Sequence, residues 1–480
     1  MRVTIQPSRA HGRVTAPPSK SVAHRALICG ALTDFSPVGG LAWSEDILAT
    51  CDCLRTLGAK IYQSGKNSVL IGYKRLSIPG SGRFDAVPEG AVLPCRESGS
   101  TLRFLIPLAM LSGRTVTFTG SERLMQRPLG IYQEIAAKNG GLFEQKDGTL
   151  TVRGGLCAGD YEIPGNISSQ FITGLLIALS LADGESRIRV TEPFESRSYT
   201  DITVAVMRDF GVPVQREGNT FVLAGNAAYQ KRPYMVEGDC SNAAFLEALA
   251  LLSEREDETG LTERSDAAEI APAHTSAQAG LTVLGVPAET CQGDHVYYEM
   301  LHSLADGTCR EFDLSDCPDL APCLFAMAAY YGGAHFTGTA RLAIKESDRA
   351  KAMAEELAKF GATVSVGEND VTVAAGKNYI AENGNTAAEG GNNAADGTNN
   401  TADGTNNVAF GANAAAKAAT SLHAPAEVLS GHNDHRIVMA LALLCTVTGG
   451  VIDGAEAVAK SYPDFFEVIG SAGITVSCDD

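Results

Sequence analysis

Residues 344–349, with the sequence IKESDR, place two cationic and two acidic side chains within five successive positions. Ser347 stands directly before an amphipathic, helix-like stretch, so we expect it to cap that helix by accepting backbone N–H bonds. The aspartate that follows is expected to favour the helix N-terminus through its charge. Lys345, Glu346 and Arg349 are then candidates for one wall of a site that holds charged groups.

Cationic residues recur at the starts of other helix-like segments. Lys20, Arg25, Arg103 and Arg436 enter apolar segments, where burying a cation without a partner is costly. Helix N-termini carry unpaired N–H groups and partial positive charge, so several of them converging with cations would bind an anion. N-capping alone could explain any one helix start. The joint pattern predicts a small polyanionic ligand, phosphorylated or carboxylated.

Composition limits the possible partners. The net charge of −18 argues against nucleic acid or an anionic membrane surface, because both favour a basic partner. No apolar run approaches the ~20 residues that span a bilayer, and the N-terminus lacks the apolar core of a signal peptide. The 12 cysteines form no C-x-x-C pair, which favours buried thiols in a reducing compartment over a metal site. We expect a soluble, cytoplasmic protein without a metal.

The chain contains six copies of one pattern, in which an apolar helix, a short β-branched strand and an amphipathic helix follow one another. The apolar helices are expected to begin near Ser21, Ser100, Ser168, Ser241, Asp319 and His435. The amphipathic helices are expected to begin near Glu45, Pro128, Tyr199, His295, Ser347 and Tyr462. Six such units predict α/β or α+β domains of three units each.

Two insertions interrupt this spacing, at about residues 254–280 and 377–426. The second is rich in Asn, Gly, Ala and Thr and contains AADGTNN followed by TADGTNN. Such a composition cannot offset its ordering entropy, so we expect a mobile surface loop without a catalytic role.

Eight motifs in order make the chain resemble the 5-enolpyruvylshikimate-3-phosphate synthase family: PPSKSVAHRAL, ESGSTLRF, LMQRPLG, ISSQFITGLL, CPDLAP, IKESDRA, GHNDHRIVMAL and AKSYPDFF. The resemblance covers nearly the whole chain except the insertions. It implies two domains, each of three βαβαββ units in a pseudo-threefold arrangement, with the substrate cleft between them. Residues 20–235 would form one domain, and residues 1–19 and 236–480 the other.

The reaction implied by this resemblance belongs to the shikimate pathway to chorismate and the aromatic amino acids. The enolpyruvyl group of phosphoenolpyruvate is transferred to the 5-hydroxyl of shikimate 3-phosphate, and phosphate is released through a tetrahedral adduct. The resemblance implies no metal and no organic cofactor, and we expect a monomer whose partners are these two small molecules.

Matching motifs imply the roles of individual residues. Asp319 resembles the base for the 5-hydroxyl and Glu346 the partner in proton transfer at the methylene carbon, although Lys20 remains an alternative for part of that transfer. The residues expected to hold both substrates are Lys20, Ser21 and Arg25. Those expected to hold shikimate 3-phosphate are Ser168, Ser169, Gln170, Ser196 and Tyr199. Those expected to hold phosphoenolpyruvate are Gly99, Arg127, Arg349, Arg436 and Lys460. Lys345 and His435 complete the site, and His435 could act either as a general acid or through an orienting hydrogen bond.

Two other functions remain open at this point. An enolpyruvyl transferase acting on UDP-N-acetylglucosamine would share the fold and the donor, but the loop TGSERLMQRP has no cysteine. A catalytically silent ligand-binding relative would not need Lys20, Asp319, Glu346 and Arg349 together.

Deleting residues 380–424 should leave the fold and the activity largely intact, because this segment has almost no large apolar side chains to pack. Soluble yield and phosphate release, compared between the deletion variant and the full chain, measure this. Loss of soluble protein would show that the segment has a structural role.

Overall fold

The computed structural model describes residues 1–73, 87–254, 280–374 and 422–479. The predicted insertions at 254–280 and 377–426 lie outside these residues except at their edges. In the part of the chain that is described, no helix combines the length and apolar character needed to cross a membrane.

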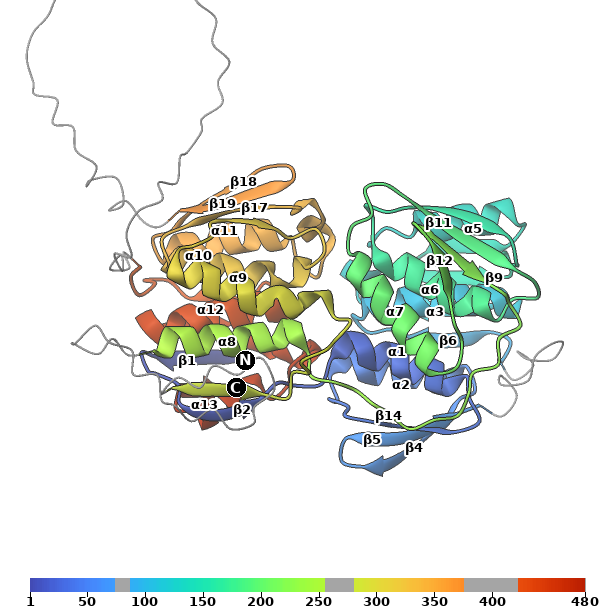
Figure 1. Ribbon diagram of the computed structural model, residues 1–480, viewed down its shortest axis with the longest axis horizontal. Coiled ribbons are helices and arrows are strands. Elements are labelled where there is room, and N and C mark those ends of the chain that lie inside the picture. The colour runs from blue at the N-terminus through green and yellow to red at the C-terminus, as the bar shows by residue number, and fades with distance from the viewer. Residues whose placement is uncertain (74–86, 255–279, 375–421, 480) are drawn as a thin grey trace, which may run out of the picture.

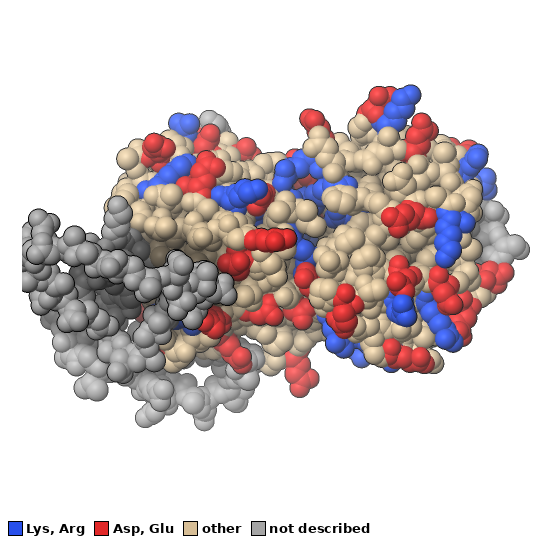
Figure 2. Space-filling view, turned by 90° about the horizontal axis from the view of Figure 1, so that it is seen from above, with Lys and Arg blue, Asp and Glu red and all other residues tan. Residues whose placement is uncertain are grey.

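Two lobes lie side by side, each around its own hydrophobic core (Figure 1). The core of the first lobe takes its residues from positions 22–236. The core of the second lobe combines positions 3–16 with positions 240–474. This division supports our proposed domain boundaries at residues 20 and 235. Seen from above, Lys and Arg side chains gather where the lobes meet (Figure 2).

The chain passes between the lobes twice, and the two passages are hydrogen-bonded to each other. Ser19 N donates to Glu237 O at 2.7 Å, and Asp239 N donates to Pro17 O at 2.8 Å. The Lys20 amide also donates to the Asp239 carboxylate at 3.1 Å. Both passages therefore lie at one edge of the interface between the lobes.

Five four-stranded sheets share one topology, in which a parallel pair is followed by two antiparallel strands. Their orders are β14-β3-β5-β4, β6-β7-β9-β8, β10-β11-β13-β12, β16-β17-β19-β18 and β20-β21-β1-β22. The remaining pair, β15 with β2, is parallel and has two strands in the described residues.

The strands of the first lobe are β3 (Ser36–Gly39), β4 (Lys60–Gly65), β5 (Ser68–Gly72), β6 (Ala91–Pro94), β7 (Val116–Thr119), β8 (Leu142–Lys146), β9 (Thr149–Arg153), β10 (Asp160–Pro164), β11 (Ser186–Thr191), β12 (Gln215–Glu217), β13 (Thr220–Leu223) and β14 (Tyr234–Met235). The strands of the second lobe are β1 (Arg2–Gln6), β2 (Gly12–Thr15), β15 (Leu281–Leu284), β16 (Glu311–Asp313), β17 (Ala334–Thr337), β18 (Thr363–Val366), β19 (Asp370–Ala374), β20 (Leu429–Ser430), β21 (Gly450–Asp453) and β22 (Thr475–Asp479).

Six apolar helices are buried almost all round, as their sequences predict. They are α1 (Lys20–Ala31), α3 (Gly99–Ser112), α6 (Ser169–Ser180), α8 (Cys240–Ser253), α10 (Ala321–Tyr330) and α12 (His435–Thr448). The amphipathic helices are α2 (Glu45–Thr56), α5 (Gly130–Lys138), α7 (Arg197–Asp209), α9 (Tyr297–Asp306), α11 (Arg349–Lys359) and α13 (Phe465–Ser471). Each begins within three residues of its predicted start. Short helical turns are α4 (Glu122–Met125), η1 (Gly293–Val296), η2 (Pro318–Leu320), η3 (Ala340–Ile344) and η5 (Ala455–Lys460).

The predicted cap of α11 is wrong. Asp348, not Ser347, occupies the N-cap, and its carboxylate accepts from the Lys351 amide at 3.3 Å. Ser347 instead donates its hydroxyl to the buried carboxylate of Asp434 at 3.0 Å. The Ser347 hydroxyl thus bonds to Asp434, which is distant in the sequence, and the neighbouring Asp348 caps the helix instead.

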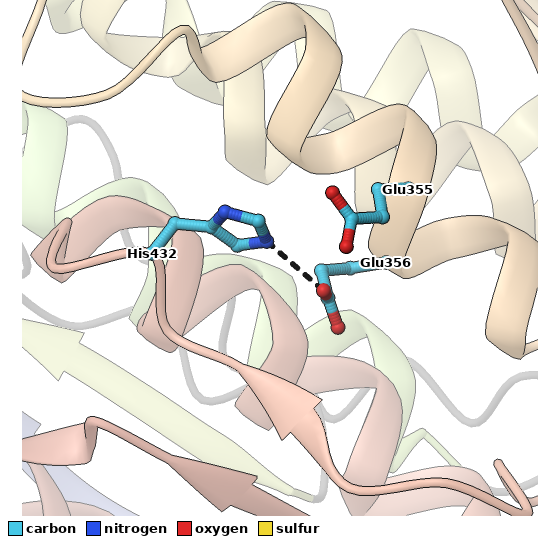
Figure 3. Close-up of side chains that lie close together, drawn as sticks. All are labelled: Glu355, Glu356 and His432. Carbon is cyan, nitrogen blue, oxygen red and sulfur yellow. Dashed lines mark hydrogen bonds and ion pairs between the residues drawn. The ribbon is translucent and has the colours of Figure 1, made fainter.

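A buried carboxylate ties α11 to the segment before α12. Glu355, Glu356 and His432 bring their oxygen and nitrogen atoms within 4.8 Å of one another (Figure 3). However, both Glu356 oxygens accept from the Lys359 ammonium at 2.9 Å, and one also meets His432 Nε2 at 2.9 Å. The lysine supplies the positive charge, so this group is an internal ion-pair cluster that anchors the start of α12.

Substituting Gly174 with alanine should destabilise the first lobe. A Cβ on this residue of α6 would lie 2.5 Å from the Arg103 carbonyl oxygen of α3 and 2.6 Å from the Tyr132 hydroxyl. Forcing two packed helices apart costs about 1–3 kcal/mol, measurable by urea unfolding. Gly470→Ala on α13 is the matched control, because nothing lies within 4 Å of its added Cβ. Equal midpoints for the two variants would contradict the close α3–α6 approach.

Candidate active site

One cavity lies between the lobes, and the first turns of the apolar helices line it. Residues at the starts of α1, α3, α6 and α12 and in η2 before α10 all contribute to its wall. Every predicted site residue except Lys460 lines this cavity. Residues that the predicted set omits also line it, namely Asp46, Ser100, Arg103, Phe104, Ile167, Arg341 and Ile344.

Arg349 is the centre of the second lobe's wall. Its guanidinium is 1% exposed and donates from Nη1 to Asp319 at 2.9 Å, from Nη2 to Glu346 at 2.8 Å and from Nε to Asp434 at 2.9 Å. Burial opposes its charge, yet the three carboxylates raise its pKa above the ordinary value. One cation from α11 therefore holds three carboxylates of three different segments.

Asp319 lies among three cations. Arg349 and Lys345 contact its Oδ1 at 2.9 and 3.2 Å, and Arg436 donates to its Oδ2 at 3.0 Å. Burial by itself would raise the pKa of this carboxyl, but Arg436, Lys345 and Arg349 together hold it well below its usual range. Asp319 is therefore ionised at neutral pH and can accept a hydrogen bond from a ligand hydroxyl.

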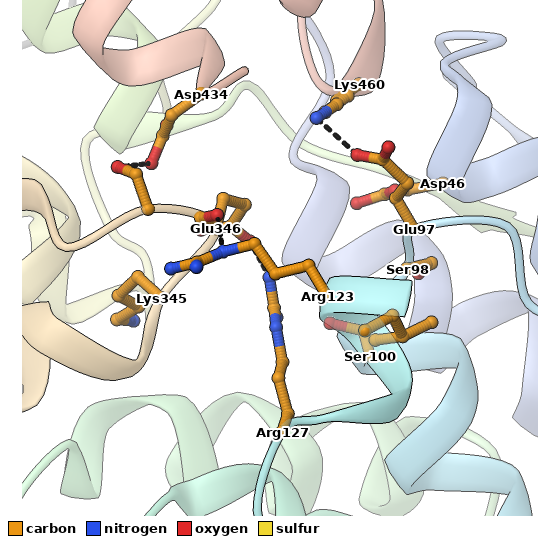
Figure 4. A network of polar contacts seen from close by, with 12 residues as sticks. Asp46, Glu97, Ser98, Ser100, Arg123, Arg127, Lys345, Glu346, Asp434 and Lys460 are labelled. Atoms are coloured by element: carbon orange, nitrogen blue, oxygen red, sulfur yellow. Dashed lines mark hydrogen bonds and ion pairs between the residues drawn. The ribbon is translucent and has the colours of Figure 1, made fainter. Parts of the chain in front are cut away.

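Glu346 is held by groups from both lobes (Figure 4). Arg349 donates to its Oε2, and Arg127 Nη2 of the first lobe lies 3.7 Å from its Oε1. Arg123 of α4 donates a hydrogen bond across the interface to the Glu346 carbonyl oxygen. Burial opposes the ionised form, but Arg349 and Arg127, with a smaller effect from Lys20, lower the pKa of Glu346 well below its usual value.

The first lobe presents cations that its own carboxylates do not neutralise. Arg25 donates only to neutral oxygens, those of Thr203, Thr173, Ser21 and Tyr199, at 2.6–3.2 Å. Arg103 donates to Gln170 Oε1 at 2.8 Å and to a carbonyl oxygen. Burial lowers the pKa of each guanidinium to about 10. Within the described residues neither has a carboxylate within ion-pair distance, so an anion in the cavity would be stabilised by both.

Gly99 and Gln170 shape the wall between these cations. Arg127 Nη1 would lie 2.6 Å from a Cβ at Gly99, so only glycine lets this guanidinium approach the start of α3. Gln170 accepts from Arg103 and donates to the Ser100 hydroxyl at 3.1 Å. Ser168 caps α6 by accepting from the Gln170 amide at 3.3 Å, which leaves its hydroxyl proton free for a ligand.

Lys20 and Lys460, both predicted site residues, occupy different positions. Lys20 lines the cavity and donates to the Asp46 carboxylate at 2.9 Å. Lys460 lies at the rim, where its ammonium donates to Asn433 O at 2.6 Å and pairs with Glu97 of the opposite lobe (Figure 4). Lys460 thus bridges the lobes in this structure, and its expected contact with the donor substrate stays a prediction.

His435 is buried in the cavity wall, and its ring nitrogens make no hydrogen bond with the described residues. Burial and the nearby Lys20 charge lower the pKa of His435 well below its usual value. The ring is therefore neutral at neutral pH. This favours the orienting hydrogen bond over the general acid, since a general acid needs the imidazolium.

The loop before α7 is fixed by residues of the second lobe. Ser196, in a left-handed conformation with φ of 52°, accepts from Arg341 Nη2 at 2.7 Å. Arg341 also pairs with Glu195 at 2.6 Å, and the Ser196 amide donates to Ser315 O at 3.0 Å. Tyr199 donates its hydroxyl to Asp294 at 2.7 Å. Ser196 and Tyr199, which are expected to hold shikimate 3-phosphate, are thus positioned by residues of the second lobe.

Sequence reasoning missed Asp46, Arg341 and Asp294 for a common reason. Asp46 and Asp294 each stand at the start of a helical segment, where an acidic residue needs no further explanation. Arg341 lies eight residues before Arg349 and could have been added to the cations that precede α11. The partners of Arg341 and Asp294 lie in the other lobe, and Lys20, the partner of Asp46, lies on a different helix of the same lobe, so none of them leaves a local signal.

The sequence model of the family described as EPSP synthase (3-phosphoshikimate 1-carboxyvinyltransferase) matches residues 5–389 and 402–469. The 3-phosphoshikimate 1-carboxyvinyltransferase of Clostridium kluyveri is 35% identical, covering 98% of this chain and 97% of its own length. The enzyme of the same name from Clostridium novyi is 33% identical with the same coverage.

Two solved structures share the fold. EPSP synthase from Acinetobacter baumannii superposes with a TM-score of 0.66 at 23% identity, covering 100% of both chains. The enolpyruvyl transferase NikO from Streptomyces tendae gives a TM-score of 0.67 at 14% identity, covering 99% of this chain and 98% of its own. These likenesses confirm the predicted fold class, and the sequence relatives confirm the predicted family. The chain belongs to the EPSP synthase family of transferases, the 3-phosphoshikimate 1-carboxyvinyltransferases.

Proposed function

We propose that the cavity holds phosphoenolpyruvate and shikimate 3-phosphate side by side, so that the enolpyruvyl group is transferred from the first to the second. We also propose that the protein works as a cytoplasmic monomer. The observation that carries the first proposal is the contrast between the walls of the cavity. Among the described residues, Arg25 and Arg103 of the first lobe are buried without carboxylate partners. In contrast, surrounding cations hold Asp319 and Glu346 of the second lobe ionised. Anionic substrates would neutralise the first wall and meet proton acceptors on the second.

The first lobe suits the phosphate of shikimate 3-phosphate. Ser168, Ser169 and Ser196 offer hydroxyls to the cavity near Arg25 and Tyr199. Helix α6 adds the partial positive charge of its N-terminus at the same place. A ligand phosphate there would leave the sugar-like ring to extend toward Asp319, which can accept a hydrogen bond from its 5-hydroxyl.

A group of cations in the cavity wall suits phosphoenolpyruvate. Arg127, Lys20 and Arg436 line the cavity, and Gly99 permits the close approach of Arg127. Guanidinium groups match carboxylate and phosphate oxygens in pairs, which fixes the orientation of the donor. Glu346 then lies between Arg127 and Arg349, within the same group of cations.

Substrate charge would change the protonation of the two carboxylates. The surrounding cations hold Asp319 and Glu346 ionised. A bound phosphate and carboxylate bring negative charges that oppose this effect, so the pKa of Glu346 rises. Glu346 can then carry a proton to the methylene carbon, while Asp319 accepts the proton of the 5-hydroxyl.

Asp319→Asn and Glu346→Gln should each lower kcat by about 10²–10⁴-fold, because each removes a proton-transfer group while keeping its size. Phosphate release from shikimate 3-phosphate and phosphoenolpyruvate is the measurement. Glu217→Gln, on the exposed strand β12, is the control and should match the wild type. A wild-type protein that releases no phosphate above background would contradict the proposed function.

Gly99→Ala should weaken phosphoenolpyruvate binding selectively. The added Cβ would displace Arg127, and the KM for phosphoenolpyruvate should rise about tenfold or more, since hydrogen bonds to charged groups contribute ~1.5–3 kcal/mol each. The KM for shikimate 3-phosphate should change less. Gly130→Ala at the start of α5 meets no atom within 4 Å and serves as the control. An equal rise in both KM values would argue against placing the donor beside Arg127.

A further inference from the structure

Asp294 is a buried carboxyl group that the proposed reaction does not use. It lies in η1 of the second lobe and is 5% exposed. Its Oδ2 accepts from the Tyr199 hydroxyl of the first lobe at 2.7 Å. Its Oδ1 is buried and has no hydrogen-bond partner among the described residues. A buried carboxylate with one unpaired oxygen is costly, and protonation of the carboxyl group lowers this cost by removing its charge.

The surroundings of Asp294 contain charges of both signs. The charged and titratable groups that face it are Tyr199 of α7, Asp319 of η2, Arg436 of α12, Asp239 at the start of α8, and the thiols of Cys240 and Cys317. Burial, helped by Asp319 and opposed by Arg436, raises the pKa of Asp294 to about 7. Burial also raises the pKa of both thiols, so they stay uncharged.

The protonation state of Asp294 decides where the Tyr199 hydroxyl points. A tyrosine has one O–H donor and can also accept. When Asp294 is ionised, it takes that donor, and Tyr199 has no proton to offer to the cavity. When Asp294 is neutral, its own O–H can donate to the Tyr199 oxygen. The Tyr199 proton is then free to turn toward a ligand acceptor, such as a phosphate oxygen, in the cavity that Tyr199 lines.

We propose that Asp294 is a positioning residue for Tyr199 and that the enzyme takes up a proton on this carboxyl when it binds its phosphorylated acceptor substrate. The proton comes from solvent and forms one O–H bond on Asp294, and no other covalent bond changes. The inference rests on the proposed function, because it requires shikimate 3-phosphate to bind beside Tyr199. Because Asp294 and Tyr199 belong to opposite lobes, their hydrogen bond also joins the two lobes.

Calorimetric titration with shikimate 3-phosphate, in buffers of different ionisation enthalpy, measures the protons taken up on binding. At pH 7 the wild type should take up about half a proton more than Asp294→Asn, as a group with a pKa near 7 is about half ionised there. The asparagine variant should bind without this excess, because its amide can donate to Tyr199 at any pH. Titration of the ligand's own phosphate is common to both proteins and cancels in the comparison.

The affinity for the same ligand should follow the neutral fraction of Asp294. Wild-type Kd should rise about tenfold more than that of Asp294→Asn between pH 6 and pH 8, because only the neutral form is competent. Tyr199→Phe provides a second test should the asparagine variant fail to fold. It should bind more weakly at pH 6 and take up fewer protons than the wild type.

Equal proton uptake by the wild type and the folded variants would overturn the inference while leaving the proposed function intact. Full affinity of Tyr199→Phe at pH 6 would overturn it as well. If shikimate 3-phosphate does not bind the wild type at all, the proposed function fails and the inference fails with it.

Discussion

The buried guanidinium of Arg349 is the contact on which the second lobe's wall depends. It is the shared partner of Asp319 in η2, Glu346 just before α11 and Asp434 just before α12. Without this cation, three carboxylates would lie close together in a region of low dielectric, where each would repel the others. The positions of α11, η2 and the start of α12 are therefore linked through one side chain, and so are the protonation states of the groups they carry.

The first lobe's wall of the cavity carries positive charge that is not neutralised, since Arg25 and Arg103 are buried among neutral oxygens. Burying them costs folding free energy that ordinary packing does not return. An anionic ligand removes this cost when it binds, because it neutralises the two guanidinium groups. Part of the free energy of binding therefore comes from neutralising charges that are buried in the protein. Anions that bind here should stabilise the folded state relative to the unfolded state by mass action, because only the folded state brings these cations together.

Local pattern in the sequence predicted the six-unit architecture, and the family resemblance implied most of the residues that line the cavity. Apolar helices such as α6 are recognised by composition, and cations such as Arg25 stand out at their starts. The contacts between segments could not be predicted this way. Ser347 was assigned to its own helix because its acceptor, Asp434, lies 87 residues away. Asp294 went unnoticed because its significance comes from Tyr199, 95 residues earlier and in the other lobe.

The double passage of the chain between the lobes also constrains the order of events during synthesis. Strand β1 pairs with both β21 and β22, so Arg2 is matched with Asp453 and Asp479. The core of the first lobe comes from one continuous stretch of sequence, and all of its residues have been synthesised once Val236 is added. Strand β1 must remain without its neighbours until β21 and β22 have been made. Vectorial folding can therefore complete the first lobe before the sheet of the second lobe that contains β1.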